Sequence, residues 1–431
     1  MRFRDAPSLF HLHYSDRLLR AVAALGAALS LVALAGLLDA APLWLGVAVW
    51  LALWVLYLSI VNVGQMFYGF GWESMLLEAG FFAAFLGPGG LAPSLVPVLA
   101  LRWMLFRVEL GAGLIKLRHD RCWRDLTCLY YHHETQPMPN PLSATFHALP
   151  RAVQRASVAF SHFVQVAAPF ALFAPQPAAA IAGAFIISQQ LVLIVSGNYA
   201  WLNWLTVILG LTAFSDGTLR FAAAQPALAP QPAAFEVALY VLAGVTALLS
   251  IQPTLNLFSK HQKMNYSWNP LHLVGAYGAF GSVTRRRYEI VVEGTEDDAI
   301  SAATGWREYE FKGKPGDVRR RPRQWAPYHL RLDWLMWFLP LSVAVVGDRQ
   351  ASILGHERWF VRFVEKLLDA DPATLALLRS DPFDGRRPRF VRASFYRYRF
   401  ADRRTRRATG VWWERTYVDE YLRPQQRRRA N

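Results

Sequence analysis

The sequence is poor in charge and in cysteine. Charged side chains make up 18% of the 431 residues, compared with about 25% in an average soluble domain, and 2 residues are cysteine. Two cysteines cannot build a disulfide scaffold, and a hydrophobic content of 54% excludes a disordered chain. Lysine is scarce as well, because 40 of the 46 basic residues are arginine. No nucleic-acid recognition motif accompanies these arginines, so we attribute them to a GC-rich bacterial genome and expect no nucleic-acid binding.

Short motifs of catalysis and cofactor binding are missing too. The sequence contains no P-loop, no dinucleotide-binding fingerprint and no G-x-S-x-G elbow. Cys122 and Cys128 are six residues apart, a spacing that matches no zinc or redox motif. In an oxidising compartment the two would form a small-loop disulfide, and in the cytoplasm they would be ordinary thiols. We therefore expect neither a metal nor a cofactor and leave the redox state of the cysteines open.

Long apolar runs are abundant, and they lie before about residue 252. A membrane-spanning helix needs about 20 mostly apolar residues. The runs 18–38 and 41–63 meet this length, whereas 72–86 is short and 95–117 carries four charges. This half of the chain is thus predicted to be a polytopic helical bundle in a membrane. The candidate spans are residues 18–38, 41–63, 72–86, 95–117, 156–174, 177–195, 199–214 and 235–251.

Basic residues outside the spans predict a topology. They precede the first span in residues 1–17 and recur in the connection 118–155. Positive residues close to spans favour the cytoplasmic side. With eight spans, this rule places both termini in the cytoplasm.

The last third of the chain has the pattern of a water-facing domain. Alternating, β-branched or aromatic segments predict four strands, and two apolar segments predict helices. The first helix, 332–345, is rich in tryptophan and fits either the membrane interface or the core of this domain. The predicted strands are residues 288–294, 307–316, 387–400 and 411–421, and the second helix is 356–378.

The predicted fold class is an α-helical polytopic membrane bundle of about eight spans followed by a C-terminal α+β domain with antiparallel strands. Proline and glycine mark a connecting loop between the two parts. The predicted boundaries are a transmembrane domain at 1–251, a linker at 252–285, an extracytoplasmic α+β domain at 286–423 and a basic tail at 424–431.

Charges within the fourth apolar segment need partners. Charged side chains at membrane depth are costly unless they pair or face a polar cavity. Glu109 is two residues from Arg107 and lies on another helix face, so Glu78 of the preceding span is the better partner for Arg107 than Glu73 or Glu109. Lys116 either reaches the interface or lines a functional cavity. Glycines at 111 and 113 permit close helix approach.

Residues 129–150 combine a polar cluster with dense proline. His132, His133, Glu134 and Gln136 are followed by prolines at 137, 139 and 141. Proline at this density predicts an extended, rigid loop. Adjacent histidines on an extended segment point to opposite faces, so a shared metal ion is not expected. The cluster is either a polar cap on the bundle or a contact for a substrate or partner.

Five long blocks of the sequence resemble the lipase maturation factor family. They read SIVNVGQMFYGFGWESMLLEAGF, FRVELGAGLIKLRHDRCWRDLTCLYYHHETQPMPNP, VLIVSGNYAWLNWLT, YEIVVEGTED with WREYEFKGKPG, and APYHLRLDWLMWF. The resemblance implies a membrane protein that assists folding and dimer assembly of secreted lipases. It also implies a C-terminal region facing the endoplasmic reticulum lumen in eukaryotes, and so the periplasm in a bacterium. The bundle is more distantly similar to relatives of vitamin-K-dependent carboxylases.

The family pattern and the charge rule disagree about the N-terminus. Members of the family carry a further helix before the position of residue 18. Without that helix, eight spans place both termini outside. We favour this topology because a long C-terminal domain is translocated largely regardless of its charge. The expected location is the bacterial inner membrane, with the C-terminal domain in the periplasm.

Two functions compete at this stage. The leading hypothesis is a membrane-embedded, chaperone-like maturation factor, whose partners are a client protein such as a lipase and membrane lipid. The alternative is a membrane enzyme acting on a lipid or a protein side chain, with Lys116, His132, His133 and Glu134 as catalytic candidates. The predicted binding residues are Trp72, Glu73, Glu78, Arg107, Gln136, Asn198, Trp201, Trp204, Arg397 and Arg399.

Overall fold

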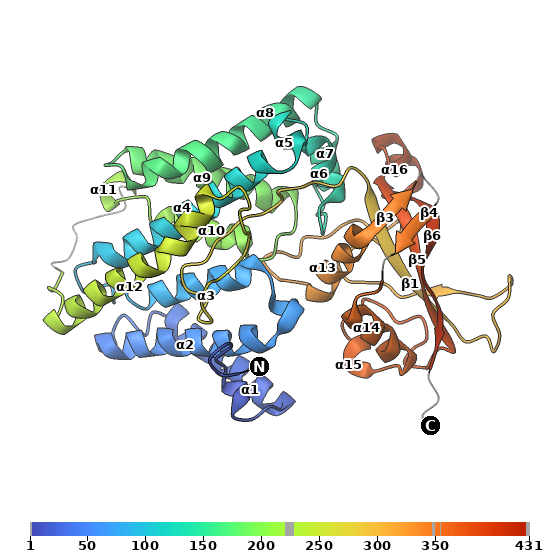
Figure 1. Ribbon diagram of the computed structural model, residues 1–431, viewed down its shortest axis with the longest axis horizontal. Helices are drawn as coiled ribbons and strands as arrows, with labels where there is room; N and C mark the ends of the chain where they lie inside the picture. The colour runs from blue at the N-terminus through green and yellow to red at the C-terminus, as the bar shows by residue number, and fades with distance from the viewer. Residues whose placement is uncertain (1, 220–227, 347–349, 354, 428–431) are drawn as a thin grey trace. The chain divides into compact units, whose positions relative to one another are not determined.

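The computed structural model describes residues 2–219, 228–346, 350–353 and 355–427 (Figure 1). The chain forms two compact units. Half of the predicted basic tail, residues 428–431, lies outside the described residues. The helical unit comprises Met1–Leu126, Arg155–Val192 and Trp201–Ser282, and the C-terminal unit comprises Thr127–Gln154, Leu193–Ala200 and Val283–Asn431.

Ten helices of the described residues belong wholly or largely to the helical unit. The stretch that begins with α8 continues through a π-helical turn, Phe163–Ala167, and a 3-10 turn, Ala168–Phe173. Two further 3-10 turns are Leu9–His11 and Gln65–Tyr68. The helices are α1 (Asp16–Leu34), α2 (Leu43–Val63), α3 (Gly71–Ala83), α4 (Leu95–Arg118), α5 (Arg121–Arg124), α8 (Arg151–His162), α9 (Ala178–Ser196), α10 (Leu202–Leu211), α11 (Asp216–Leu219) and α12 (Ala233–Phe258).

Five helical stretches of the described residues are long and apolar enough to cross a membrane. They are α1, α2, Arg151–Phe173, α9 and α12. Three of the eight predicted spans therefore lack support from length and composition. Helix α3 has 13 residues and includes two glutamates, α10 has 10 residues, and α4 is long but charged at five positions.

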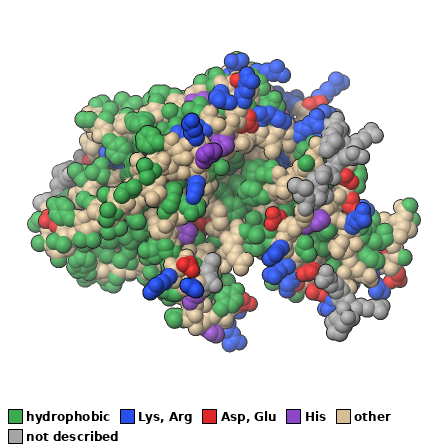
Figure 2. Space-filling view, in the orientation of Figure 1, with side chains coloured by type: hydrophobic (Ala, Val, Ile, Leu, Met, Phe, Trp, Pro, Cys, Tyr) green, Lys and Arg blue, Asp and Glu red, His purple; other side chains and the backbone are tan. Residues whose placement is uncertain are grey.

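Helix α4 lies at the centre of the helical unit. It contacts α3, α10, α12 and the turns that follow α8. From Met104 to Gly113 its residues are buried on every side of the helix. A helix that is buried all round needs no amphipathic stripe. The outer helices instead expose apolar side chains such as Leu248, which is 70% exposed, and Figure 2 shows this hydrophobic surface.

The predicted linker 252–285 is an ordered part of the protein. Helix α12 continues to Phe258. The chain after it packs against the helical unit, with Leu273, Val274 and Tyr277 buried. Gly111 explains one close contact, because a Cβ atom added there would lie 2.3 Å from the carbonyl oxygen of Tyr277. The glycine predicted to permit close approach therefore meets an extended segment here.

The C-terminal unit contains a four-stranded antiparallel sheet in the order β2-β1-β5-β6. All four predicted strands are confirmed, but the second shrinks to two residues because the chain after it turns into a loop. The strands are β1 (Arg287–Thr295), β2 (Arg307–Glu308), β5 (Phe390–Phe400) and β6 (Trp413–Gln426), and a separate, unpredicted hairpin pairs β3 (Val343–Val346) with β4 (Gln350–Ile353).

Two helices cover one face of the sheet and form the core of this unit. Leu332 and Met336 of α13 pack with Phe360 and Leu367 of α14 against alternate strand residues such as Val391. The segment predicted at 332–345 is thus a core helix, and it is shorter than expected. The helices of this unit are α6 (Leu129–Thr135), α7 (Ser143–His147), α13 (Arg331–Phe338), α14 (Arg358–Leu368), α15 (Pro372–Leu375) and α16 (Arg403–Thr409).

Candidate functional site

Arg107 and Glu78 form the predicted ion pair inside the helical unit. The Arg107 side chain is 1% exposed and Glu78 is fully buried. The guanidinium donates to both carboxylate oxygens and to the carbonyl of Gly275. Glu78 also accepts hydrogen bonds from the Gly275 amide at 3.0 Å and the Tyr277 hydroxyl at 2.7 Å. The network fixes the segment after α12 against α3 and α4.

The other charges of α4 bind amides of neighbouring helices. Glu109 accepts from the Gln190 amide at 2.8 Å, and Gln190 in turn accepts from Asn203 at 2.6 Å. Lys116 donates to Gln165 at 2.7 Å, and its Nζ lies 5.2 Å from the Trp123 ring centre. Gln165 lies in the π-helical turn Phe163–Ala167. Lys116 is therefore buried in a hydrogen-bonded site.

Four predicted binding residues of the helical unit differ in their exposure to solvent. Trp72 stacks on Phe70 and is buried, and Glu73 accepts a hydrogen bond from Tyr57 and is fully buried. The Trp201 indole donates to the carbonyl of Trp72 at 3.0 Å. Trp204 is 41% exposed. Of the four, Trp204 alone offers a large apolar surface.

The predicted extended loop begins as a helix. His132, His133 and Glu134 lie on helix α6. The prolines begin only at residue 137, so the residues before them can form a helix. The His132 ring lies 2.9 Å from the Tyr199 hydroxyl, and the Glu134 carboxylate accepts the Phe400 amide at 2.8 Å. Burial lowers the pKa of His133 to about 4. A general base for neutral pH needs a pKa near 7, so His133 is poorly suited to that task.

Gln136 and Asn198 hold loops of the C-terminal unit together. Gln136 donates to Ser143 and to the Ser196 carbonyl, and accepts the Tyr199 hydroxyl at 2.5 Å. Asn198 donates to the Arg323 carbonyl at 2.9 Å and accepts the backbone amides of 325 and 326 at 2.7 and 2.9 Å. Asn198 is fully buried and Gln136 is 1% exposed. Gln136 and Asn198 therefore hold the loops that they contact in place.

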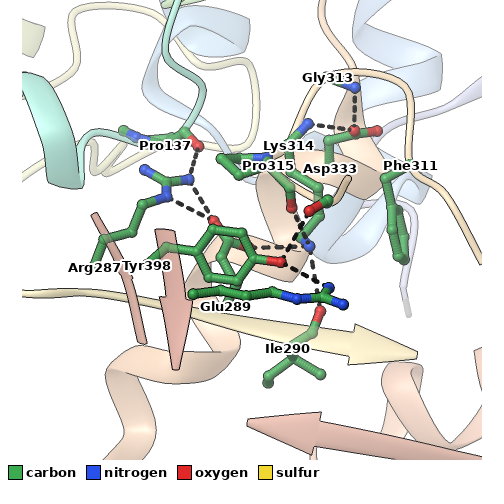
Figure 3. Close-up of polar contacts among 12 residues, drawn as sticks. Pro137, Arg287, Glu289, Ile290, Phe311, Gly313, Lys314, Pro315, Asp333 and Tyr398 are labelled. Carbon is green, nitrogen blue, oxygen red and sulfur yellow. Dashed lines mark hydrogen bonds and ion pairs between the residues drawn. The ribbon is translucent and has the colours of Figure 1, made fainter. Parts of the chain in front are cut away.

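A charged cluster that the sequence analysis did not single out anchors this region (Figure 3). Arg287 of β1 is 1% exposed and donates to the carbonyls of Glu134, Gln136 and Pro137 at 3.0, 2.5 and 3.0 Å. It also pairs with Glu289 two positions along the strand. One arginine therefore donates hydrogen bonds to three carbonyls of this proline-rich loop. The loop has few backbone amide donors of its own, because proline has no N–H group.

Lys314 completes the cluster. Its ammonium lies 3.0 Å from Glu289 and donates to the carbonyls of Ile290 and Pro315. The turn that carries it is fixed by Asp333, which accepts the amides of Gly313 and Lys314 at 2.6 and 2.9 Å (Figure 3). The sequence does carry a pattern that indicates this cluster. Arg287 and Glu289 alternate with apolar residues, which places both charges on one face of the strand.

Arg397 and Arg399 lie on the same face of β5 as the core residues, beyond the point where the helices cover it. Arg399 pairs with Glu414 at 2.6 Å and its side chain is 64% exposed. Arg397 is half-buried. Even-numbered residues of β5 point to the opposite face, because strand side chains alternate.

That opposite face carries interleaved aromatic and charged side chains, and we call it the open sheet face. Arg415 forms a two-pronged ion pair with Glu308 at 3.0 and 2.6 Å. Its guanidinium carbon lies 5.0 Å from the centre of the Tyr396 ring. Tyr417 is 53% exposed. The open sheet face consists of Trp306, Glu308, Arg392, Tyr396, Arg415 and Tyr417.

The site chemistry favours binding. A cavity of about 950 Å³ in the C-terminal unit is lined mainly by α14 and β6, and Lys116, His132, His133 and Glu134 are not among its lining residues. On α6, His132 and His133 are buried, and the His133 ring packs against Phe146, whereas Glu134 is half-buried. The open sheet face, in contrast, presents Tyr, Trp and Arg, the residue types that dominate protein-binding hot spots. Both cysteines are disulfide-bonded, which answers the question that their spacing left open.

Comparison with known proteins covers nearly the whole chain. Residues 1–221 match the lipase maturation factor transmembrane domain, and residues 273–423 match the lipase maturation factor C-terminal domain. Lipase maturation factor 1 of Bos taurus is 43% identical over 408 residues, which cover 86% of this chain and 70% of that protein. The human protein of the same name is 43% identical over 404 residues, with the same coverage.

A second group of relatives is more distant. Lipase maturation factor 2 of Xenopus laevis is 27% identical over 553 aligned residues, which cover 98% of this chain and 75% of that protein. No solved structure matches the chain. Both domains and the high identity over most of the sequence lead to one conclusion. The chain belongs to the lipase maturation factor family.

Proposed function

We propose that this chain is a membrane-embedded maturation factor that binds a lipase during folding. The observation that carries the proposal is the 43% identity to lipase maturation factor 1 over 86% of the chain, across both domains. Binding, and not bond-making, is the proposed mode of action. The open sheet face is the proposed client surface, because Tyr417 is exposed on it and its half-buried arginines, Arg392 and Arg415, are already positioned by ion pairs.

We also propose that all eight predicted segments cross the membrane. The C-terminal unit gathers three parts of the chain: 127–154, 193–200 and 283–427. If this unit lies on one side of the membrane, an even number of crossings separates consecutive parts. Between 127–154 and 193–200, the two crossings are the stretch that begins with α8 and helix α9. Between 193–200 and 283–427, two crossings require that α10 crosses the membrane as well as α12.

Contacts among the loops of the helical unit support the same count. The Gly89 amide lies 3.4 Å from the Asp39 carboxylate, and the Ala92 amide donates to the carbonyl of Ala229 at 2.9 Å. The loops after α1, α3 and α10 thus meet one another. The C-terminal end of α2 instead contacts both the N-terminal segment and the chain after α12, because Asn62 donates to the carbonyls of Pro7 and Pro270. Helices α3 and α4 then cross between these two sets of loops.

We place the C-terminal unit on the extracytoplasmic side, and the periplasm of a bacterium remains our proposal for the compartment. The disulfide supports this side, since disulfides persist in oxidising compartments. The basic loop 118–155 argues for the cytoplasm by the charge rule. We give the disulfide more weight than the basic residues of this loop, because the charge rule for membrane topology is a statistical tendency.

The topology can be tested with alkaline phosphatase fusions to truncated chains. Eight crossings predict that activity alternates along the chain, since each helix moves the fusion point to the other side. Activity is expected after His147, Gly197 and Asn431, and no activity after Gly89, Pro175 and Asp216. With only five crossings, fusions after Gly197 and Asp216 would give the same result. An inactive fusion after Asn431 would contradict the extracytoplasmic assignment.

Client binding is expected to depend on the open sheet face. Replacing Trp306 and Tyr417 together by alanine should lower the yield of active lipase by roughly tenfold or more, the range of interface hot spots. The assay is secretion of active lipase from cells that lack their own lipase maturation factor 1 and express this chain. The double change Arg397→Ala with Arg399→Ala is the matched control on the other face. An equal loss in that control, with an unchanged thermal transition, would move the client surface there.

The binding and enzyme hypotheses make opposite predictions for α6. If the protein acts by binding, replacing His132, His133 or Glu134 singly by a residue of similar size, such as His133→Asn, should leave lipase yield within a few-fold of wild type. Loss of a general acid or base costs typically a hundredfold or more. A loss of that size from one of these changes, in a protein that still folds, would contradict a pure binding function.

A further inference from the structure

Two arginine-rich segments of the C-terminal unit form a surface that the client proposal does not use. The first is the run from Arg319 to Arg323, and the second is helix α16. Arg320 turns inward and donates to carbonyls of the neighbouring turn, including that of Lys314 at 2.5 Å. The other arginines are exposed or half-buried. We call the following residues the arginine patch: Arg319, Arg321, Arg323, Arg403, Arg404, Arg406 and Arg407.

Trp412 joins the two segments into one surface. Its backbone amide donates to the carbonyl of Val318 at 2.7 Å. The guanidinium carbons of Arg321 and Arg406 lie 5.4 and 5.1 Å from the centre of its ring. Both distances are within the range of a cation–π interaction. One indole therefore holds an arginine from each segment, and Figure 2 shows Lys and Arg side chains gathered over α16.

Acidic residues do not balance the patch. Within 317–323 and 402–412 the acids are Asp317 and Asp402. Asp402 caps α16 by accepting the Thr405 amide at 2.7 Å, and this hydrogen bond lowers its pKa. Asp317 accepts the Arg319 amide at 2.9 Å. Two carboxylates against seven arginines leave a strongly positive surface that fits an anionic ligand.

The position of the patch along the chain identifies the kind of anion. Asn198 clamps the backbone of residues 323–326, as described above, and Asn198 lies in the connection between α9 and α10. Helix α9 ends at Ser196 and is a candidate span. The first arginine segment is therefore held, through Asn198, just beyond the end of a candidate span. Tyr328, which is 66% exposed, follows it, and arginine with tyrosine is typical of the headgroup level of a membrane.

We propose that the arginine patch binds the phosphate groups of anionic phospholipids at the membrane surface and holds the C-terminal unit against the bilayer. Guanidinium groups suit this task because they contact phosphate oxygens in pairs. A basic residue close to an anionic membrane surface contributes about fivefold in affinity. The proposal does not depend on the identity of the client.

The test is the lipid retained by the full-length protein. Wild type is reconstituted in nanodiscs made from an equal mixture of phosphatidylcholine and phosphatidylglycerol, extracted in mild detergent, and analysed for bound lipid by mass spectrometry. We expect phosphatidylglycerol to be enriched. The triple change Arg319→Gln, Arg321→Gln, Arg323→Gln should lower that enrichment by about fivefold or more. The corresponding lysine variant should keep part of it, because the positive charges remain while the paired contacts to phosphate oxygens are lost.

The matched control removes three exposed arginines elsewhere in the same unit: Arg358→Gln, Arg362→Gln and Arg423→Gln. It should leave the enrichment unchanged, and the thermal transition of each variant reports folding. Unchanged enrichment in the patch variant, or an equal fall in the control, would overturn the proposal. So would loss of crosslinking to a client with lipid retention intact, which would assign the patch to an acidic protein segment. A rise in thermal midpoint with inorganic phosphate that equals the rise with phosphatidylglycerol would indicate a site for free phosphate instead.

Discussion

Replacing Arg107 by alanine is expected to destabilise the helical unit by about 3–5 kcal/mol, the cost of leaving one partner of a buried ion pair unpaired. Glu78 would remain fully buried with only the Gly275 amide and the Tyr277 hydroxyl as donors. The carbonyl of Gly275 would lose its donor as well. The thermal midpoint of the protein in detergent should fall by roughly 10 °C.

Two further variants make this result specific to the buried pair. Removing both charges with Arg107→Leu and Glu78→Gln should recover a large part of the loss, because no unpaired charge remains. Arg121→Ala breaks a pair with Asp125 in which the side chains are 82% and 51% exposed, so it should cost at most about 1 kcal/mol. An Arg107→Ala protein as stable as wild type would mean that this charge reaches water.

The second large effect is expected from Arg287 in the C-terminal unit. Arg287→Ala removes the donor to three loop carbonyls and leaves Glu289 with Lys314 as its charged partner. Buried pairs broken in this way lose about 3–5 kcal/mol. We expect residues 127–154 to become sensitive to limited proteolysis while the helical unit stays resistant. The two readouts separate local loosening from global unfolding.

Arg389 provides the control for this prediction. It pairs with Asp298, and the two side chains are 60% and 85% exposed. Arg389→Ala should therefore leave the protease pattern unchanged, since exposed pairs contribute at most about 1 kcal/mol. If Arg287→Ala also left the pattern unchanged, other contacts of the loop, such as those of Gln136 and Asn198, would be sufficient to hold it.

Local patterns in the sequence determined several elements of this protein. Helical spacing excluded Glu109 as the partner of Arg107 and pointed to Glu78, because residues two apart on a helix face apart. Alternation located β1, β5 and β6, since strand side chains point to alternate faces. Five long blocks identified the family. These results depend on neighbours along the chain, where geometry is set by the backbone alone.

The membrane spans were only partly predictable. Five of eight segments meet the length and composition of a span. For α4 the sequence shows apolar residues and charges together and does not say which protein surfaces will surround them. Burial by α3, α10 and α12 makes those charges tolerable, and burial is a property of packing.

The tertiary structure alone decided which distant segments work together. Residues 127–154 and 193–200 belong to the C-terminal unit although candidate spans separate them in the sequence from residues 283–427. Arg287 looked like an ordinary strand residue, and its three carbonyl partners lie about 150 positions earlier. The arginines at 319–323 likewise looked alike until Arg320 turned inward and the others outward. Such roles follow from long-range hydrogen bonds and burial, which no local pattern of residues encodes.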